Sequence, residues 1–173
     1  SRWAEFGHRS QVLHGTLDEI CRIIDLDGQE LSGAVFDLGV SSHQLDTPSR
    51  GFSYRNAGRL DMRMNPKDPL EAETIVNTYS KEELTFLLRT NSDERFAHRI
   101  ANSIISARPV ESTHELAEIV RLAVPAAARR TGRHPAMRTF QAIRIAVNNE
   151  LALIQPALAQ TIERLRPGGR LVV

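Results

Sequence analysis

The chain has 173 residues, of which 41% are hydrophobic and 25% charged, and its formal net charge is +1. These values are ordinary for a folded domain in water, and they argue against a disordered chain, a membrane-spanning protein and a strongly basic nucleic-acid binder. The single cysteine, Cys21, cannot form an internal disulfide, so we expect a reducing, cytoplasmic location.

The first third of the chain predicts a parallel sheet. Residues 11–14 are a candidate strand, and apolar residues at helical spacing predict a helix over about 18–25. Residues 34–38 then form a continuous apolar run, which is typical of a parallel strand that is buried on both faces. The order strand, helix, strand with short connections indicates an α/β fold.

The end of this apolar run has the composition of a binding edge. It ends near Asp37, and Gly39, Ser41 and Ser42 follow. Ligands of open α/β sheets collect at the carboxyl ends of strands, where a carboxylate accepts hydrogen bonds and a glycine lets the backbone approach closely. The alternative is a salt-bridged turn without a ligand.

Irregular and then helical sequence follows. Residues 47–69 are rich in proline, glycine and arginine, which predicts a long ordered loop that lines a site or leads into an inserted element. Helices are expected from a capping box at Ser80, over residues 93–105, and from Thr113 onward. Residues 70–130 therefore read as an all-helical segment.

The last part of the chain returns to the sheet. A long helix is predicted over residues 135–166, followed by a strand over 170–173. Arg138, Gln141 and Asn148 share one face of this helix. Amide side chains both donate and accept hydrogen bonds, so this polar face is either a site or ordinary solvated surface.

Positive charge gathers between residues 121 and 149, where no Asp or Glu occurs. The arginines of this stretch are Arg121, Arg129, Arg130, Arg133, Arg138 and Arg144. Such a cluster attracts phosphate, which favours an RNA or DNA partner, although arginines paired with acidic helices elsewhere are an equal alternative. With one Trp and two Tyr, the chain is a poor candidate for a single-strand binder built on aromatic platforms.

Several blocks of sequence, in a fixed order, carry a resemblance. They are residues 36–46, 50–53, 60–64, 134–136, 138–142, 144–145, 147–148, 150–151 and 167–171. Together they closely resemble the MraW/RsmH family of small-subunit ribosomal RNA cytosine-N(4) methyltransferases over nearly the whole chain. The resemblance implies S-adenosyl-L-methionine as cofactor and methylation of the N4 amine of a cytosine in the decoding centre of 16S ribosomal RNA.

The resemblance also implies an architecture. We expect a partial Rossmann-like class I methyltransferase core, formed by residues 1–60 and 136–173, with an all-helical inserted subdomain over 61–135 on the substrate side. The sequence contains neither the family's glycine-rich cofactor loop nor the Ser-Phe-His-Ser segment that follows the final strand. We therefore expect the chain to be part of a longer protein and to be inactive by itself.

Site residues are carried over from the family's motifs or from their place in the loop blocks. The cofactor positions are Leu17, where the family usually has Phe, Asp37 and Gln44; the catalytic candidates are Asp37 and Ser42. The candidates for the RNA entrance are Arg50, Asp61, Arg63, His134, Arg138 and Asn148. His134 precedes a proline at a helix start, so packing or capping is an equal interpretation. No metal site is expected.

Three functions remain open at this point. The first is the ribosomal RNA methyltransferase, with small-subunit ribosomal RNA or the assembled small subunit as partner and no membrane contact; a homodimer is left open. The second is an amino-methyltransferase that acts on DNA or protein. The third is a non-catalytic RNA-binding or ribosome-assembly module.

Overall fold

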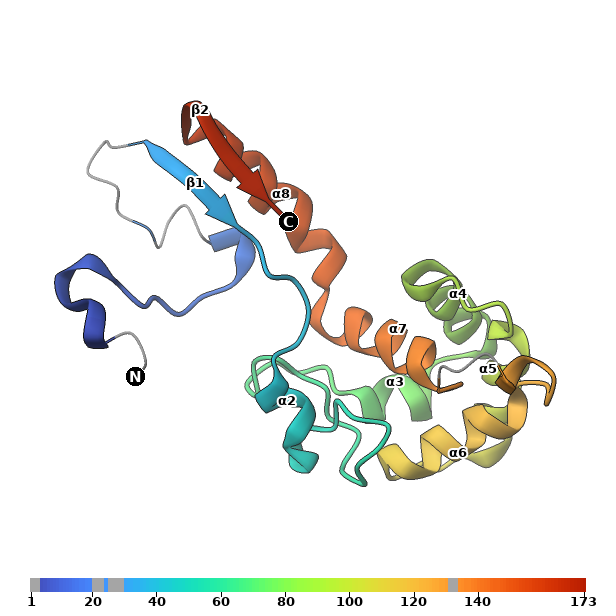
Figure 1. Cartoon of the computed structure of the whole chain (residues 1–173). Coiled ribbons are helices and arrows are strands. Elements are labelled where there is room, and N and C mark those ends of the chain that lie inside the picture. The colour runs from blue at the N-terminus through green and yellow to red at the C-terminus, as the bar shows by residue number, and fades with distance from the viewer. Residues whose placement is uncertain (1–3, 20–23, 25–29, 131–133) are drawn as a thin grey trace. The chain divides into compact units, whose positions relative to one another are not determined.

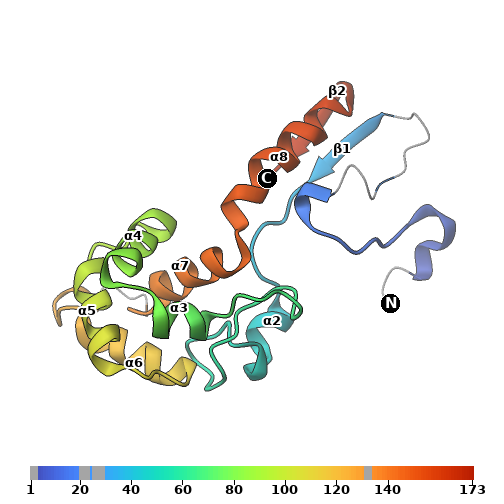
Figure 2. The same cartoon turned by 180° about the vertical axis from the view of Figure 1, so that it is seen from behind.

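A computed structural model describes residues 4–19, 24, 30–130 and 134–173 (Figure 1). The chain forms two compact units: the first consists of Ser1–Gly39 and Glu150–Val173, and the second of Val40–Asn149. Figure 2 shows the elements of both units from behind. The division into a methyltransferase core and an insert at residues 60 and 136 stays a prediction.

The first unit contains a two-stranded sheet among its described residues, and its parallel pairing is as the sequence predicted. Strands β1 (Leu31–Val35) and β2 (Leu165–Val172) pair with Leu31 opposite Leu165 and, after a register shift, Gly33 opposite Arg170. Beyond β1, the Phe36 amide donates to the Val172 carbonyl at 2.8 Å. The sheet pairing thus extends one residue past the strand and ends next to Asp37.

Burial on both faces of this strand, which the apolar run predicted, is not found. Ser32 and Gly33 are exposed, and Val35 is 78% exposed, whereas Phe36 is buried. The elements described for this unit, two strands and one long helix with short 3₁₀ turns, offer too few side chains to cover both faces of a sheet. Among the described residues of this unit, the apolar run is therefore only partly covered.

Short helices and one long helix complete the first unit. They are the 3₁₀ helices η1 (Ala4–Arg9) and η2 (Leu17–Glu19) and the α-helix α8 (Glu150–Glu163), which contacts η2. Residues 11–14 are not a strand. Most of the helix predicted over 18–25 lies outside the described residues, and only η2 is seen at its start.

The prediction of a single long helix over residues 135–166 is wrong. Helix α7 (Met137–Asn148) ends at Asn149, whose φ of 50° and ψ of 34° are left-handed, and α8 begins at the next residue. Asparagine adopts this conformation more readily than most residues. Strand β2 also starts earlier than predicted, so that Gly168 and Gly169 lie inside it.

The second unit is helical and contains the larger core. Its α-helices are α2 (Ser42–Asp46), α3 (Ala72–Thr78), α4 (Lys81–Ser92), α5 (Ala97–Ala107), α6 (Thr113–Ala123) and α7, and its 3₁₀ helices are η3 (Pro48–Arg50) and η4 (Ala128–Arg130). Helix α4 packs against α5 and α7, and α5 packs against α6. Their buried side chains include Ile75, Leu84, Leu88, Ile100, Ile104, Leu116, Val120 and Ile143. The predicted capping box at Ser80 is confirmed by its reciprocal hydrogen bonds with Glu83.

The loop between α2 and α3 is tied to the start of α6. The Thr113 hydroxyl accepts from the Gly58 amide at 2.9 Å and donates to the Asn56 carbonyl at 2.8 Å. Arg59 and Ser112 form an isolated antiparallel bridge. A Cβ atom on Gly58 would lie 1.9 Å from the Pro48 carbonyl oxygen, so this close approach requires glycine. In the described part of the chain, no helix has the length and apolar character needed to cross a membrane.

Candidate functional site

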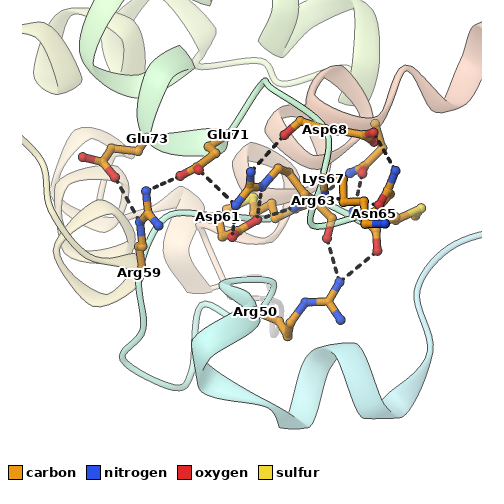
Figure 3. A network of polar contacts seen from close by, with 12 residues as sticks. Arg50, Arg59, Asp61, Arg63, Asn65, Lys67, Asp68, Glu71 and Glu73 are labelled. Atoms are coloured by element: carbon orange, nitrogen blue, oxygen red, sulfur yellow. Dashed lines mark hydrogen bonds and ion pairs between the residues drawn. The ribbon is translucent and has the colours of Figure 1, made fainter.

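An ion-pair network holds the loop against the start of α3 (Figure 3). The Arg63 guanidinium donates twice to the Asp61 carboxylate, from Nε to Oδ1 at 2.9 Å and from Nη2 to Oδ2 at 2.8 Å. It also lies 3.0 Å from Glu71 Oε1 and donates to the Asp68 carbonyl at 2.9 Å. The side chains of Arg63 and Asp61 are only 14% and 15% exposed. A partly buried two-pronged pair of this kind fixes geometry as well as charge.

The electrostatics of Asp61 follow from these contacts. Burial would raise the pKa of its carboxyl group, but hydrogen bonds from the Arg63 side chain and backbone and the positive charges of Arg63 and Arg59 outweigh burial. The pKa of Asp61 is therefore below its usual value of 3.8. In turn, the Asp61 carboxylate raises the pKa of Arg63. Both groups are charged at neutral pH.

Arg50 supports the same loop from the other side. Its Nη2 donates to the carbonyls of Arg63 at 2.7 Å and Met64 at 3.0 Å, and its guanidinium carbon lies 5.6 Å from the centre of the Phe52 ring. The Arg50 Nε is buried and has no hydrogen-bond partner among the described residues. The visible role of this arginine is to hold the backbone at residues 63–64.

Asn148 joins the end of α7 to this loop. Its Oδ1 accepts from the Met64 amide at 2.6 Å, and its Nδ2 donates to the carbonyls of Met62 and Arg144, each at 2.8 Å. Met62 is buried and has a φ of 60°. The amide side chain thus fixes a loop whose backbone is unusual for a non-glycine residue.

The structure brings four of the six predicted RNA-entrance residues into one assembly. The polar side-chain atoms of these four residues form hydrogen bonds mainly with the loop itself. The four are Arg50, Asp61, Arg63 and Asn148. This internal role was missed in the sequence, because spacing along the chain does not reveal that Asn148 lies beside residues 62–64. Contact of these four residues with RNA stays a prediction.

His134 and Arg138 form a second group, at the start of α7. The His134 ring stacks on Tyr54, with 4.6 Å between ring centres and 13° between planes, and Tyr54 meets Phe140 edge-on. Partial burial lowers the pKa of His134 below 6.5; Glu118 acts against this shift, and Arg55 and Arg121 act with it. Its Nδ1 accepts from the Ala136 amide at 3.2 Å. The neutral ring therefore carries its proton on Nε2.

Arg138 reaches the turn between α4 and α5. Its Nη1 donates to the Asp93 carbonyl at 2.9 Å. Both His134 and Arg138 line one cavity, together with residues of that turn. Tyr54, Glu94 and Phe96 also lie in this region, although none of them is a site candidate in the sequence. The only signal for Tyr54 was its place directly after the block Arg50 to Ser53.

The predicted cofactor and catalytic residues are divided between the two units. Leu17 lies half-buried in η2, and Asp37 is exposed two residues after β1. Ser42 is exposed at the first residue of α2, and Gln44 caps the same helix: its Oε1 accepts from the Ser41 amide at 2.8 Å. The exposed Asp37 carboxylate suits recognition of ligand hydroxyl groups, whereas the Gln44 oxygen already has a protein partner. Among the described residues, no group of His, Cys, Asp and Glu is arranged to hold a metal ion.

Comparison with known proteins decides the family. The model of the MraW methylase family matches residues 1–173. This chain belongs to the MraW methylase family. The resemblance seen in the sequence blocks is thereby confirmed. MraW methylase membership implies a class I methyltransferase fold, with which the helices and the small parallel sheet are consistent.

Curated relatives agree with this family. The chain is 49% identical to ribosomal RNA small subunit methyltransferase H of Salinispora tropica, over 99% of this chain and 47% of that protein. It is 47% identical to the protein of the same name from Acidothermus cellulolyticus, over 99% of this chain and 54% of the relative. It is 46% identical to the protein of the same name from Symbiobacterium thermophilum, over 99% of this chain and 55% of the relative. The chain thus spans about half the length of the curated relatives it matches.

Proposed function

We propose that the protein containing this chain methylates small-subunit ribosomal RNA. The observation that supports this proposal most directly is the match to the MraW methylase family over the whole chain, together with relatives named for this activity. The chemistry of the first unit is compatible with it, since a parallel strand ends next to an exposed carboxylate.

We further propose that the acceptor is the N4 amine of a cytosine in the decoding centre. When bound, S-adenosyl-L-methionine supplies an electrophilic methyl group. The lone pair of a cytosine amine is delocalised into the ring, so the protein must align the amine and accept its hydrogen bonds. In this proposal, Leu17, Asp37 and Gln44 hold the cofactor, and Ser42 offers an acceptor to the amine.

The RNA side of the proposal rests on the second unit. His134 and Arg138 present a neutral ring and a guanidinium at one cavity, while Arg50, Asp61, Arg63 and Asn148 keep the neighbouring loop in shape. Guanidinium groups suit phosphate geometry. If Arg138 contacts RNA, Arg138→Ala in the full-length protein will lower RNA affinity and flatten its dependence on salt.

The test is methyl transfer by the full-length protein from labelled cofactor to intact small subunits, naked DNA and protein. Label in a cytosine of the small-subunit RNA supports the proposal, and digestion to nucleosides identifies the methylated position. Label only in DNA or protein would instead favour the second function. RNA binding without any transfer would favour the non-catalytic module.

An Asp37→Ala variant separates cofactor binding from RNA binding. In calorimetry, we expect it to lose affinity for S-adenosyl-L-methionine while RNA affinity stays unchanged. Asp46→Ala is a matched control, because Asp46 is an exposed carboxylate at the far end of α2. Equal cofactor affinity in both variants would remove Asp37 from the cofactor site.

A further inference from the structure

The second unit contains a cavity of about 360 Å³ at the start of α7. Its walls come from the turn between α4 and α5, the segment that follows α6, and the first turn of α7. Among the described residues, the lining includes Glu94, Arg95, Phe96, Val124, Ala128, His134, Pro135, Met137 and Arg138. A volume of this size is in the range of small-ligand pockets.

We propose that this cavity binds one unpaired nucleotide of the RNA, with the base beside His134 and the phosphate at Arg95 and Arg138. This inference rests on the proposed function, because it assigns a specific part of the RNA substrate to a specific place in the chain. Of the residues that line this cavity, only His134 and Arg138 are site candidates in the sequence.

The apolar part of the wall suits a flat base. Phe96, Met137 and the His134 ring supply apolar and aromatic surface, and the ring is already stacked on Tyr54 at 4.6 Å. Aromatic and imidazole rings stack with unpaired RNA bases, and each such contact is worth about 1–3 kcal/mol. The stack on Tyr54 holds His134 in place before any base arrives.

Two guanidinium groups provide the positive charge. Arg138 is anchored through Nη1 to the Asp93 carbonyl, a contact that occupies one of its five donors. Arg95 is exposed at the rim. Guanidinium groups match the oxygens of a phosphate, which gives the cavity its preference for a nucleotide over a neutral base.

Glu94 adds a directional acceptor. The residue is only 5% exposed, and its Oε1 accepts from the Phe96 amide at 2.9 Å. Among the described residues, no ion pair joins Glu94 to Arg95 or Arg138, so the three charged groups do not simply satisfy one another. A carboxylate accepts from an amino group, which predicts a preference for adenine, cytosine or guanine over uracil.

The first experiment is calorimetric titration of AMP, CMP, GMP and UMP into the full-length protein. We expect at least one of the three amino-bearing nucleotides to bind about tenfold more tightly than UMP. Arg95→Glu should weaken that binding about tenfold or more, and Met137→Trp should abolish it by filling the cavity. Arg89→Glu is the matched control, because Arg89 is exposed on α4 and does not line the cavity.

Two results would overturn the inference: no nucleotide binding by the wild-type protein, or equal losses in Arg95→Glu and Arg89→Glu. Circular dichroism of each variant establishes that it is folded. If Met137→Trp fails to fold, Arg95→Glu still decides the question, because its side chain is at the surface.

Methyl transfer to small subunits separates this inference from the proposed function. If the wild-type protein methylates RNA and Arg95→Glu raises KM with little change in kcat, the cavity assignment and the proposed function are both supported. If the wild-type protein methylates RNA but binds no mononucleotide and Arg95→Glu has a normal KM, only the cavity assignment fails. If nucleotides bind at the cavity but no RNA is methylated, the proposed function fails alone.

Discussion

The backbone amide of Met64 donates to the side-chain oxygen of Asn148 across 2.6 Å, so that a loop and the end of a helix 84 positions away are joined by one short hydrogen bond. The same side chain donates to the carbonyl of Met62. One amide therefore fixes both neighbours of Arg63. The Arg63 side chain, which contacts Glu71 at the start of α3, therefore leaves a stretch of backbone that Asn148 holds on both sides.

Replacing Asn148 by Ala should destabilise the second unit by about 1–3 kcal/mol, because the Met64 amide loses its acceptor and two carbonyls lose a donor. Hydrogen exchange of the Met64 amide is the local readout, and urea unfolding gives the global value. Asn102→Ala, at an exposed position of α5, should change stability by less than about 0.5 kcal/mol. Unchanged exchange at Met64 in the Asn148 variant would contradict the role assigned to this side chain.

Asp61 should make the stability of the protein sensitive to acid. Because its pKa is below 3.8 in the folded state, the stabilisation from its ionised form is complete above that value and is lost as the pH falls through the lowered folded pKa. An Asp61→Asn variant should therefore be less stable than wild type at neutral pH, and the difference should shrink below pH 3.8. Melting temperatures over about pH 2–7 test this. A difference that stays constant with pH would show that ionisation of Asp61 does not matter.

Gly58→Ala should be poorly tolerated. The new Cβ would meet the Pro48 carbonyl oxygen at 1.9 Å, so the loop would have to move away from η3. Overpacking of this kind costs about 1–3 kcal/mol, which thermal unfolding will detect. Ala57→Ser, at the exposed preceding residue, is the control and should melt like wild type. The close approach would be refuted if both variants melted at the wild-type temperature.

Tyr54 should control the titration of His134. Burial lowers the pKa of His134, whose ring stacks on Tyr54, so we expect Tyr54→Leu, which removes the stacked ring, to move that pKa upward toward 6.5. Because the folded pKa is lowered, wild-type stability should decrease as the pH falls from 6.5 to that folded value. NMR titration of the imidazole measures the shift. Tyr79→Leu, which changes the chain's other tyrosine, should leave the pKa of His134 unchanged.

Local signals in the sequence predicted local structure well. The capping box at Ser80 and the start of α6 at Thr113 depend on neighbouring residues, and both are found as expected. Parallel pairing of the strands also followed from the order of elements. The break at Asn149 was missed because the apolar period continues across it, and a single left-handed residue leaves no trace in that period.

The candidate site was predictable only in part. The blocks of sequence pointed to Asp61, Arg63 and Asn148, but not to the contacts among them, since a hydrogen bond between residues 64 and 148 depends on the packing of the whole unit. The wall residue Glu94 had no sequence signal, because carboxylates are common just before helices; its Oε1 accepts from the amide of Phe96, the residue that precedes α5.

The bridge between Arg59 and Ser112 brings the two ends of the segment 59–112 together. Helices α3, α4 and α5 lie between these two residues in the sequence. The Thr113 hydroxyl, just after the segment, forms hydrogen bonds with Asn56 and Gly58, just before it. The entropic free-energy cost of bringing the ends of a flexible segment together grows only slowly with the length of the segment. Insertions or deletions in the surface turns of this segment can therefore accumulate without disturbing the point where it joins the rest of the chain, and variation among homologues should be greatest in those turns.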